Sequence, residues 1–220
     1  MTATALMLAT GSLRYFSLNP LVFIPSQRAA YLANLAPLLL HIAGGTVALA
    51  VGPFQFLGGL RARAPRLHRA LGRVYLGAVL MTAAGGLGLA RIAQGGPMAR
   101  LGFAALALAL LATTAIALAA ILRRRVKTHR AWMMRSYSLI FTAVTFRLWL
   151  AVLTVTGLPF DQVYAVGAWT AWMINLLVAE ALLQLGGSRQ QAGGRRRLAD
   201  ERPATARRAD SKQLTTLPES

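Results

Sequence analysis

The sequence contains no cysteine and only six acidic residues among its 220. Without thiols, the chain can form no disulfide, iron–sulfur cluster or thiolate metal site. Charged residues make up 14% of the chain, against about 25% in an average soluble domain. The sequence also lacks a hydrolase elbow, a phosphate-binding loop, an HExxH motif and a carboxylate pair. These absences remove the commonest enzyme classes, and they leave open whether the chain is an enzyme.

Apolar residues are abundant instead, at 56% of the chain. Apolar stretches long enough to cross a bilayer, about 20 residues each, recur along the sequence. They predict an all-α integral membrane helical bundle with five complete transmembrane helices. The expected spans are residues 35–57, 66–93, 101–122, 131–157 and 163–185.

Two terminal segments flank the predicted bundle, which covers residues 35–185. Residues 1–34 are expected to combine a short apolar N-terminal remnant with an extracytoplasmic segment lying on the membrane interface. Residues 1–13 are too short to span, so they are either an interfacial end or the remnant of an earlier span. Residues 186–220 are rich in Gly, Ser, Gln and Arg. This composition cannot bury a core, and it predicts a disordered basic tail.

The net charge of +18 is distributed unevenly between the connections. Connections 58–69 and 123–130 and the tail are strongly basic, whereas 94–100 contains one basic residue and 157–162 none. Because basic loops stay in the cytoplasm, we expect a multi-pass protein of the bacterial inner membrane with a cytoplasmic C-terminus. The basic residues are not interleaved with aromatics and form no nucleic-acid motif. The expected partner is therefore the lipid bilayer and no nucleic acid.

The second and fourth spans begin with the same tripeptide, His68-Arg69-Ala70 and His129-Arg130-Ala131. Each is followed by a further arginine, Arg73 or Arg135. This repeated tripeptide fits an internal duplication of a helical hairpin, with the two copies in the same orientation across the membrane.

His68 and His129 are both expected at the cytoplasmic ends of their helices, at similar depth. Two neutral imidazoles from neighbouring helices can ligate the iron of a b-type haem, and Arg73 and Arg135 could bind its propionates. No other metal site is predicted. The alternative is that these His-Arg pairs are ordinary anchors at headgroup depth.

A second candidate pair lies in the outer half of the predicted bundle, with His41 on the first span and Arg147 on the fourth. His129 and Arg147 are 18 residues apart, so one continuous helix would place both on the same stripe. The only acid within a span, Glu180, is expected near the cytoplasmic end, where it suits Arg73 or Arg135. Arg147 is then expected to bond backbone carbonyls, Gln or Asn, or an anionic ligand such as a lipid headgroup or a quinone oxygen. The alternative is snorkelling to the outer headgroups.

The end of the first span combines close packing with a helix breaker. Gly44, Ala48 and Gly52 recur every four residues, a ridge that lets another helix approach closely. Pro53 frees a backbone carbonyl and predicts a kink. Gln55 is the residue expected to satisfy that carbonyl, and it completes the set of polar interior candidates.

Three segments together resemble one known family: HIAGGTVALAVGPFQF, LHRALGRVY and THRAWMMRSYSLIFTAVTFRL. They are similar to the bacterial membrane proteins grouped as domain of unknown function 2306, and the likeness covers about residues 13–180. The resemblance implies a helical membrane protein without an assigned activity. It also implies an apolar span before residue 14, of which residues 1–13 are expected to be the remnant.

Three functions remain open from the sequence. The first is a redox membrane protein that binds haem or quinone. The second is a transporter of a small anion or metabolite, with His41 and Arg147 lining its path. The third is a non-catalytic subunit of a homo-oligomer or larger membrane complex, packed through its glycine-rich faces.

Overall fold

The computed structural model describes residues 27–155 and 157–213, together with residues 7, 10, 11, 16, 17 and 19. Most of the predicted N-terminal segment, 1–34, therefore lies outside the described residues. The described part folds into helices and contains no strand. Two compact units divide the chain, Met1–Ala179 and Glu180–Ser220. The first unit contains the bundle and every site discussed below.

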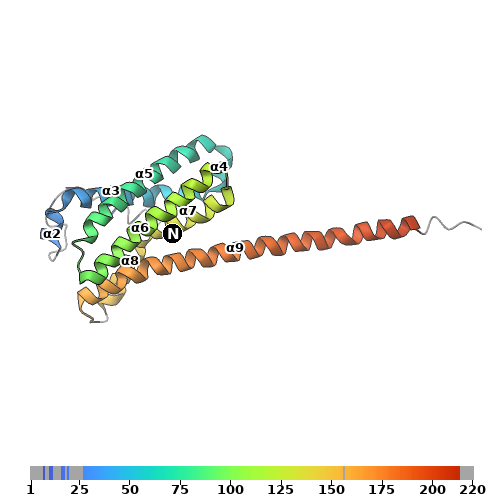
Figure 1. Ribbon diagram of the computed structural model, residues 1–220. Coiled ribbons are helices and arrows are strands. Elements are labelled where there is room, and N and C mark those ends of the chain that lie inside the picture. The colour runs from blue at the N-terminus through green and yellow to red at the C-terminus, as the bar shows by residue number, and fades with distance from the viewer. Residues whose placement is uncertain are drawn as a thin grey trace, which may run out of the picture. The chain divides into compact units, whose positions relative to one another are not determined.

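The helices follow the predicted spans closely (Figure 1). They are α2 (Arg28–Leu32), α3 (Leu35–Gln55), α4 (Gly58–Arg63), α5 (Pro65–Ala90), α6 (Gly96–Leu122), α7 (Val126–Ile140), α8 (Thr142–Thr154) and α9 (Phe160–Gln213). Five stretches of the described chain are long and apolar enough to cross a membrane, namely α3, α5, α6, α7 with α8, and the first part of α9. The predicted all-α membrane bundle with five spans is confirmed.

Four of the helices form a square around the core. Helix α3 packs against α5 and α7, and α6 packs against the same two helices. As a result, α5 and α7 face each other diagonally across the bundle. The first part of α9 joins α6, where the Trp169 indole N–H donates to the Met98 carbonyl oxygen at 3.0 Å.

Helices α3 and α5 have the most extensive packing of any pair, and glycine makes their close approach possible. A Cβ at Gly44 would lie 2.5 Å from both the Ala78 carbonyl oxygen and the Thr82 nitrogen. From the other side, Gly85 faces the backbone of Pro37 and His41. The predicted small-residue ridge is confirmed, because Gly44, Ala48 and Gly52 are all buried.

The turn between α6 and α7 is tight. Arg124 adopts a left-handed conformation with φ 57°. The Arg125 N–H donates to the Ala120 carbonyl at 2.9 Å, and the Arg124 N–H donates to Ile121 at 2.9 Å. This pair of bonds is a Schellman motif, which caps the last carbonyls of a helix. The turn reverses the chain within three residues and brings the start of α7 beside the end of α6.

The fourth span consists of two helices, α7 and α8. The expectation of one continuous helix with His129 and Arg147 on the same stripe is therefore wrong. The span breaks at Phe141, between α7 and α8, although the segment contains neither proline nor glycine. Asn175 of α9 lies at the break. Its amide nitrogen donates to the Ser138 carbonyl at 3.1 Å, and its oxygen accepts from the Thr145 hydroxyl at 2.9 Å. A side chain inserted beside the helical hydrogen-bond ladder is a known cause of kinks.

The fifth predicted span corresponds to the first part of α9, and Asp161 lies in its first turn. An acid there interacts favourably with the positive end of the helix dipole. The backbone of α9 is helical to Gln213, in the region where the composition favours disorder. The disordered tail over 186–220 stays a prediction.

Candidate functional site

One end of the bundle contains a partly open cavity, and His41 and Arg147 in its lining are exposed. A cavity of about 360 Å³, here called the chamber, lies between α3, α5, α6, α7 and α8 and reaches the start of α9. Its walls are mainly apolar, and they include the side chains of Leu38, Ile42, Leu89, Phe103, Leu106, Leu110, Ile140, Phe146 and Leu150. Small residues, including Gly45, Ala83, Gly86 and Ala107, leave the space open. Its volume falls in the range of small-molecule sites, about 300–1,000 Å³.

His41 lines the chamber from α3 and is fixed by Thr82 of α5. The Nδ1 atom of its ring lies 2.9 Å from the Thr82 carbonyl oxygen. A carbonyl can only accept, so Nδ1 carries the proton and Nε2 of the neutral ring presents a lone pair. The Thr82 hydroxyl also donates to the His41 carbonyl at 2.9 Å. Two contacts from one threonine therefore set the orientation and tautomer of this histidine.

Arg147 lines the same chamber from α8. Its Nη1 donates to the Ala143 carbonyl, four residues earlier, at 2.7 Å. Bonding of Arg147 to a backbone carbonyl is thus confirmed. The guanidinium is close enough to the His41 ring and the Tyr164 hydroxyl to interact with both electrostatically. The structure therefore brings together His41 and Arg147, the outer pair predicted from the sequence.

A second group of polar residues lines the chamber near the loops. The Gln27 side chain donates to the Gln94 side-chain oxygen at 3.0 Å. The Tyr164 hydroxyl is hydrogen-bonded to the side chains of Tyr31 and Gln27. All four residues line the chamber. An apolar cavity with polar groups converging at one side is the usual form of a small-molecule site.

Beneath the chamber the core is packed around a buried hydroxyl chain. The Ser136 hydroxyl of α7 lies 2.8 Å from the Tyr75 hydroxyl of α5 and 2.7 Å from the Thr114 hydroxyl of α6. Thr114 in turn donates to the Leu110 carbonyl at 2.7 Å. Tyr75 and Ser136 are both 0% exposed. This chain joins three helices at one level and closes the core beneath the chamber.

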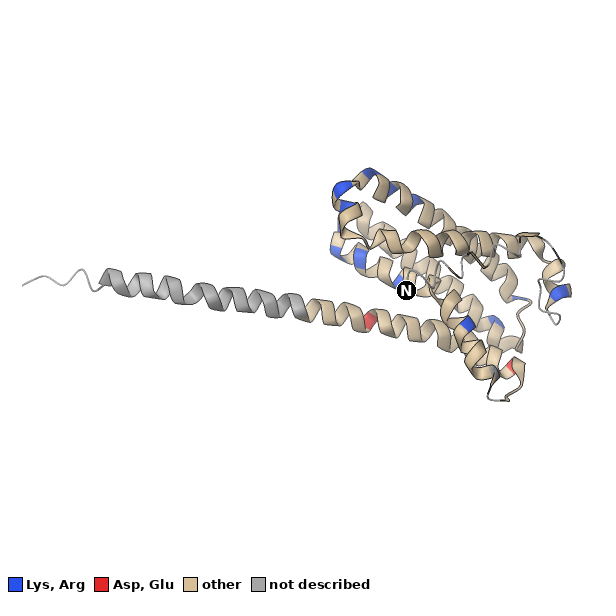
Figure 2. Ribbon diagram, turned by 180° about the vertical axis from the view of Figure 1, so that it is seen from behind, with Lys and Arg blue, Asp and Glu red and all other residues tan. Residues whose placement is uncertain are grey.

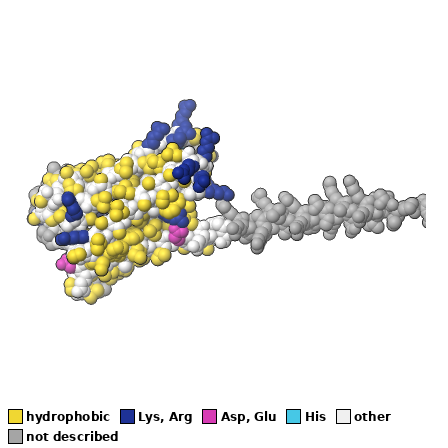
Figure 3. All heavy atoms as spheres, in the orientation of Figure 1, with side chains coloured by type: hydrophobic (Ala, Val, Ile, Leu, Met, Phe, Trp, Pro, Cys, Tyr) yellow, Lys and Arg dark blue, Asp and Glu magenta, His cyan; other side chains and the backbone are white. Residues whose placement is uncertain are grey.

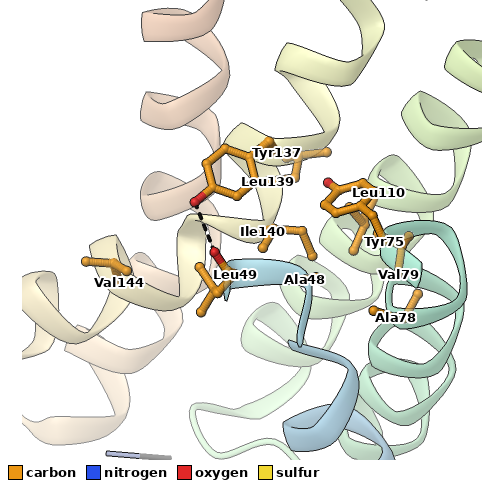
Figure 4. Close-up of a cluster of buried hydrophobic side chains, with 11 residues drawn as sticks. Ala48, Leu49, Tyr75, Ala78, Val79, Leu110, Tyr137, Leu139, Ile140 and Val144 are labelled. Carbon is orange, nitrogen blue, oxygen red and sulfur yellow. Dashed lines mark hydrogen bonds between the residues drawn. The ribbon is translucent and has the colours of Figure 1, made fainter. Parts of the chain in front are cut away.

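Figure 4 shows the hydrophobic cluster around this level and one polar contact within it. Pro53 has no N–H, so the Leu49 carbonyl, four residues earlier, has no helical donor. The Tyr137 hydroxyl donates to that carbonyl at 3.4 Å, and the Tyr137 ring lies against Gly52. The residue satisfying the carbonyl is therefore Tyr137, and the expectation that Gln55 would do so is wrong. Gln55 is buried, and its amide nitrogen has no hydrogen-bond partner among the described residues.

Gln55 does not line the chamber and lies at the opposite end of α3, against Gly72 of α5. That end carries α4 and the connection at residues 123–125, and we call it the basic end. Figure 2 shows Lys and Arg positions gathered along the ribbon at this end, and Figure 3 shows their side chains there, with hydrophobic side chains covering the middle of the bundle. The other end, which holds the chamber, is here called the far end.

His68 and His129 both lie at the basic end, at the starts of α5 and α7. The His129 Nδ1–H donates to the Ala117 carbonyl of α6 at 2.8 Å, which leaves Nε2 with a lone pair. The His68 Nδ1 is buried and has no hydrogen-bond partner among the described residues. His129 is close enough to His68 for the two rings to interact electrostatically.

The candidate arginines and the glutamate at this end differ in their surroundings. Arg73 is exposed. Arg135 is half-buried, and its guanidinium lies 4.6 Å above the Trp132 ring, a cation–π contact within one helix turn. Glu180 belongs to the second unit, and its pairing with Arg73 or Arg135 stays a prediction.

Sequence reasoning missed most of the chamber's polar residues. Thr82 looks like one more small residue in a Gly- and Ala-rich helix, and Gln94 lies in a short loop. Both acquire their role only through partners 41 and 67 residues away. Asn175 carried a usable signal, because a lone asparagine inside an apolar span calls for an interhelical partner.

The fold and the chamber together define a helical multi-pass membrane protein with an internal polar site. A family model described as "Predicted membrane protein (DUF2306)" matches residues 38–183, and the chain belongs to this family. The match confirms the resemblance seen in the sequence. Neither the search of curated proteins nor the search of solved structures found a match.

Proposed function

We propose that the protein binds a small amphiphile of the quinone type in the chamber. The observation that carries this proposal is the chamber itself, a mainly apolar cavity of about 360 Å³ lined by both His41 of α3 and Arg147 of α8. A quinone ring and its first isoprenoid units are apolar and suit the walls. The quinone oxygens are hydrogen-bond acceptors that suit an arginine.

The His41 tautomer favours a quinone over a simple anion. With Nδ1–H donated to Thr82, the neutral ring offers a lone pair at Nε2, which repels an anionic oxygen. A quinol hydroxyl can donate to that lone pair and accept from Arg147. A donor and an acceptor that line one cavity therefore match the carbonyl and hydroxyl forms of one ligand.

A transporter of anions or metabolites is less well supported. Transport needs a path through the bundle, whereas the core beneath the chamber is filled by the Tyr75–Ser136–Thr114 chain and the surrounding cluster. Membership of a homo-oligomer or larger complex stays a prediction. We further propose that the basic end and the C-terminus are cytoplasmic in a bacterial inner membrane, because basic loops are retained there. A reporter enzyme fused after Ser188 and active only in the periplasm would contradict this orientation.

Co-purification tests the proposed ligand. The protein is purified in a mild detergent, its bound lipids are extracted, and quinones are quantified by mass spectrometry per mole of protein. We expect quinone enrichment over the bulk membrane extract. In Ala107→Phe a bulky side chain fills the chamber from α6 and should remove that enrichment. Leu108→Phe is the matched control, since Leu108 is 58% exposed on the outside of the same helix.

The outcome that contradicts the proposal is equal quinone content in the wild type, in Ala107→Phe and in the bulk membrane. Thermal unfolding of both variants shows whether Ala107→Phe is folded. If it is not, Gly45→Leu fills the chamber from α3 and replaces it. Enrichment of an anionic phospholipid in place of quinone would assign the chamber to a lipid headgroup.

A further inference from the structure

The basic end contains a layer of polar groups that the chamber does not use. Gln55 of α3, His68 of α5 and His129 of α7 come from three different helices. Gln55 is 8% exposed, and its Nε2 has no hydrogen-bond partner among the described residues. The buried Nδ1 of His68 has none either. Leaving a buried polar group unpaired costs about 1–3 kcal/mol, so these two atoms favour a further group bound at this end.

The two histidines approach each other across the diagonal of the bundle. Tyr75 follows His68 by seven residues, and Ser136 follows His129 by seven, so each pair lies nearly on one face of its helix. The Tyr75 and Ser136 hydroxyls meet at 2.8 Å across the core. His68 and His129 therefore project toward the same diagonal, about 10 Å closer to the basic end.

The tautomer of His129 suits an iron ligand. Its Nδ1–H is bonded to the Ala117 carbonyl, and a second-shell bond of this kind orients a histidine whose Nε2 binds a metal. Among the described residues no group of three or more His, Cys, Asp and Glu could hold a bare metal ion. A haem needs only two protein ligands, because the porphyrin supplies the other four.

We propose that His68 and His129 are the two axial ligands of a b-type haem at the basic end. Adjacent helices lie about 8–10 Å apart, and the diagonal between α5 and α7 is wider, which gives two facing histidines room for a cofactor between them. Arg73 and Arg135 follow the histidines by five and six residues, and they would supply positive charge for the propionates. An oxygen on the bound group would satisfy the Gln55 amide.

Absorption spectroscopy of the full-length protein tests the site. The protein is expressed with a haem precursor, purified, and measured oxidised and dithionite-reduced, with haem quantified as the pyridine haemochrome. We expect one haem per chain with the spectrum of a low-spin, six-coordinate iron. His68→Ala and His129→Ala should each abolish the low-spin spectrum. Lys127→Ala is the matched control, because the exposed Lys127 side chain lies two residues before His129 on the same helix, and it should leave the spectrum unchanged.

A second measurement guards against misfolding of the variants. Protein made without the precursor is titrated with hemin, and the low-spin spectrum and the melting temperature are followed together. No low-spin spectrum from the wild type in either experiment would overturn the proposal. An unchanged spectrum in both His68→Ala and His129→Ala would overturn the ligand assignment, and so would a bound divalent metal ion in place of haem. None of these outcomes depends on quinone in the chamber, so the two proposals fail separately.

Discussion

The far end of the bundle and its middle level are built from the same helices, but they differ in how completely side chains fill the space between those helices. At the far end, α3 and α5 approach through glycine, and small side chains leave a chamber edged by His41 and Arg147. At mid-depth, the same pair of helices and α7 are packed without space around Tyr75 and Ser136. Glycine therefore allows close packing where it faces the backbone of the neighbouring helix, as Gly44 does, and leaves open volume where it faces the chamber, as Gly45 does.

The largest expected effect concerns the close contact between α3 and α5, here called the seam, which supports the chamber. Gly44→Ala places a methyl group 2.5 Å from the backbone of α5, and backbone atoms cannot turn aside. We expect a loss of about 3 kcal/mol of stability and, because α3 moves away from Thr82, loss of ligand binding as well. Thermal unfolding in detergent measures the first effect.

Gly77→Ala is the control for the seam, since a Cβ at Gly77 meets nothing within 4 Å. It should leave the melting temperature unchanged or slightly raised, because alanine favours helix more than glycine does. Equal effects of the two substitutions would show that the close approach of α3 and α5 carries no particular stability.

The next effect concerns the packed level beneath the chamber. Ser136→Ala removes the hydroxyl between Tyr75 and Thr114, and we expect a loss of about 1 kcal/mol with ligand binding in the chamber retained. Ser138→Ala is the control, because that half-buried hydroxyl donates to the Arg135 carbonyl of its own helix. Loss of quinone binding in Ser136→Ala without a change in stability would contradict the separation of the far end from the middle level.

Arg147→Leu should change binding and not folding. The Arg147 guanidinium donates to the Ala143 carbonyl of its own helix, and leucine inserts into a bilayer at lower cost than arginine. A hydrogen bond from a charged group contributes about 1.5–3 kcal/mol, so quinone affinity should fall about tenfold or more. Arg100→Leu, at the exposed start of α6, is the control. Unchanged affinity in Arg147→Leu would identify this arginine as a headgroup anchor.

The smallest effect is expected at Thr82. Thr82→Val removes the hydroxyl bond to the His41 carbonyl but keeps the backbone carbonyl that accepts from Nδ1. Quinone affinity should fall by a factor of about three, consistent with about 0.6 kcal/mol for a polar contact within a membrane protein. Thr82→Ser, which keeps the hydroxyl, should restore it. A loss as large as that of Arg147→Leu would show that the hydroxyl itself contacts the ligand.

The spans were predictable because the bilayer imposes a length and an apolar composition on them. The sequence also placed His41 and Arg147 at one depth, since costly polar groups tend to face a common interior, and both residues line the chamber. The break at Phe141 was not, because no proline or glycine marks it and its polar partner, Asn175, lies on another helix. Tyr137 was missed for the same reason. Its bond to Leu49 depends on which helices are neighbours, and local sequence does not carry that information.

Photoaffinity labelling tests the central claim most directly. A quinone with a photoreactive group on its ring is bound to the wild-type protein in lipid nanodiscs and activated, and the labelled residues are located by mass spectrometry. The account predicts label on chamber residues of α3, α5 and α8 around His41 and Arg147, removed by excess unlabelled quinone and by Ala107→Phe. Label confined to the lipid-facing residues of the bundle, and not removed by competition, would contradict it.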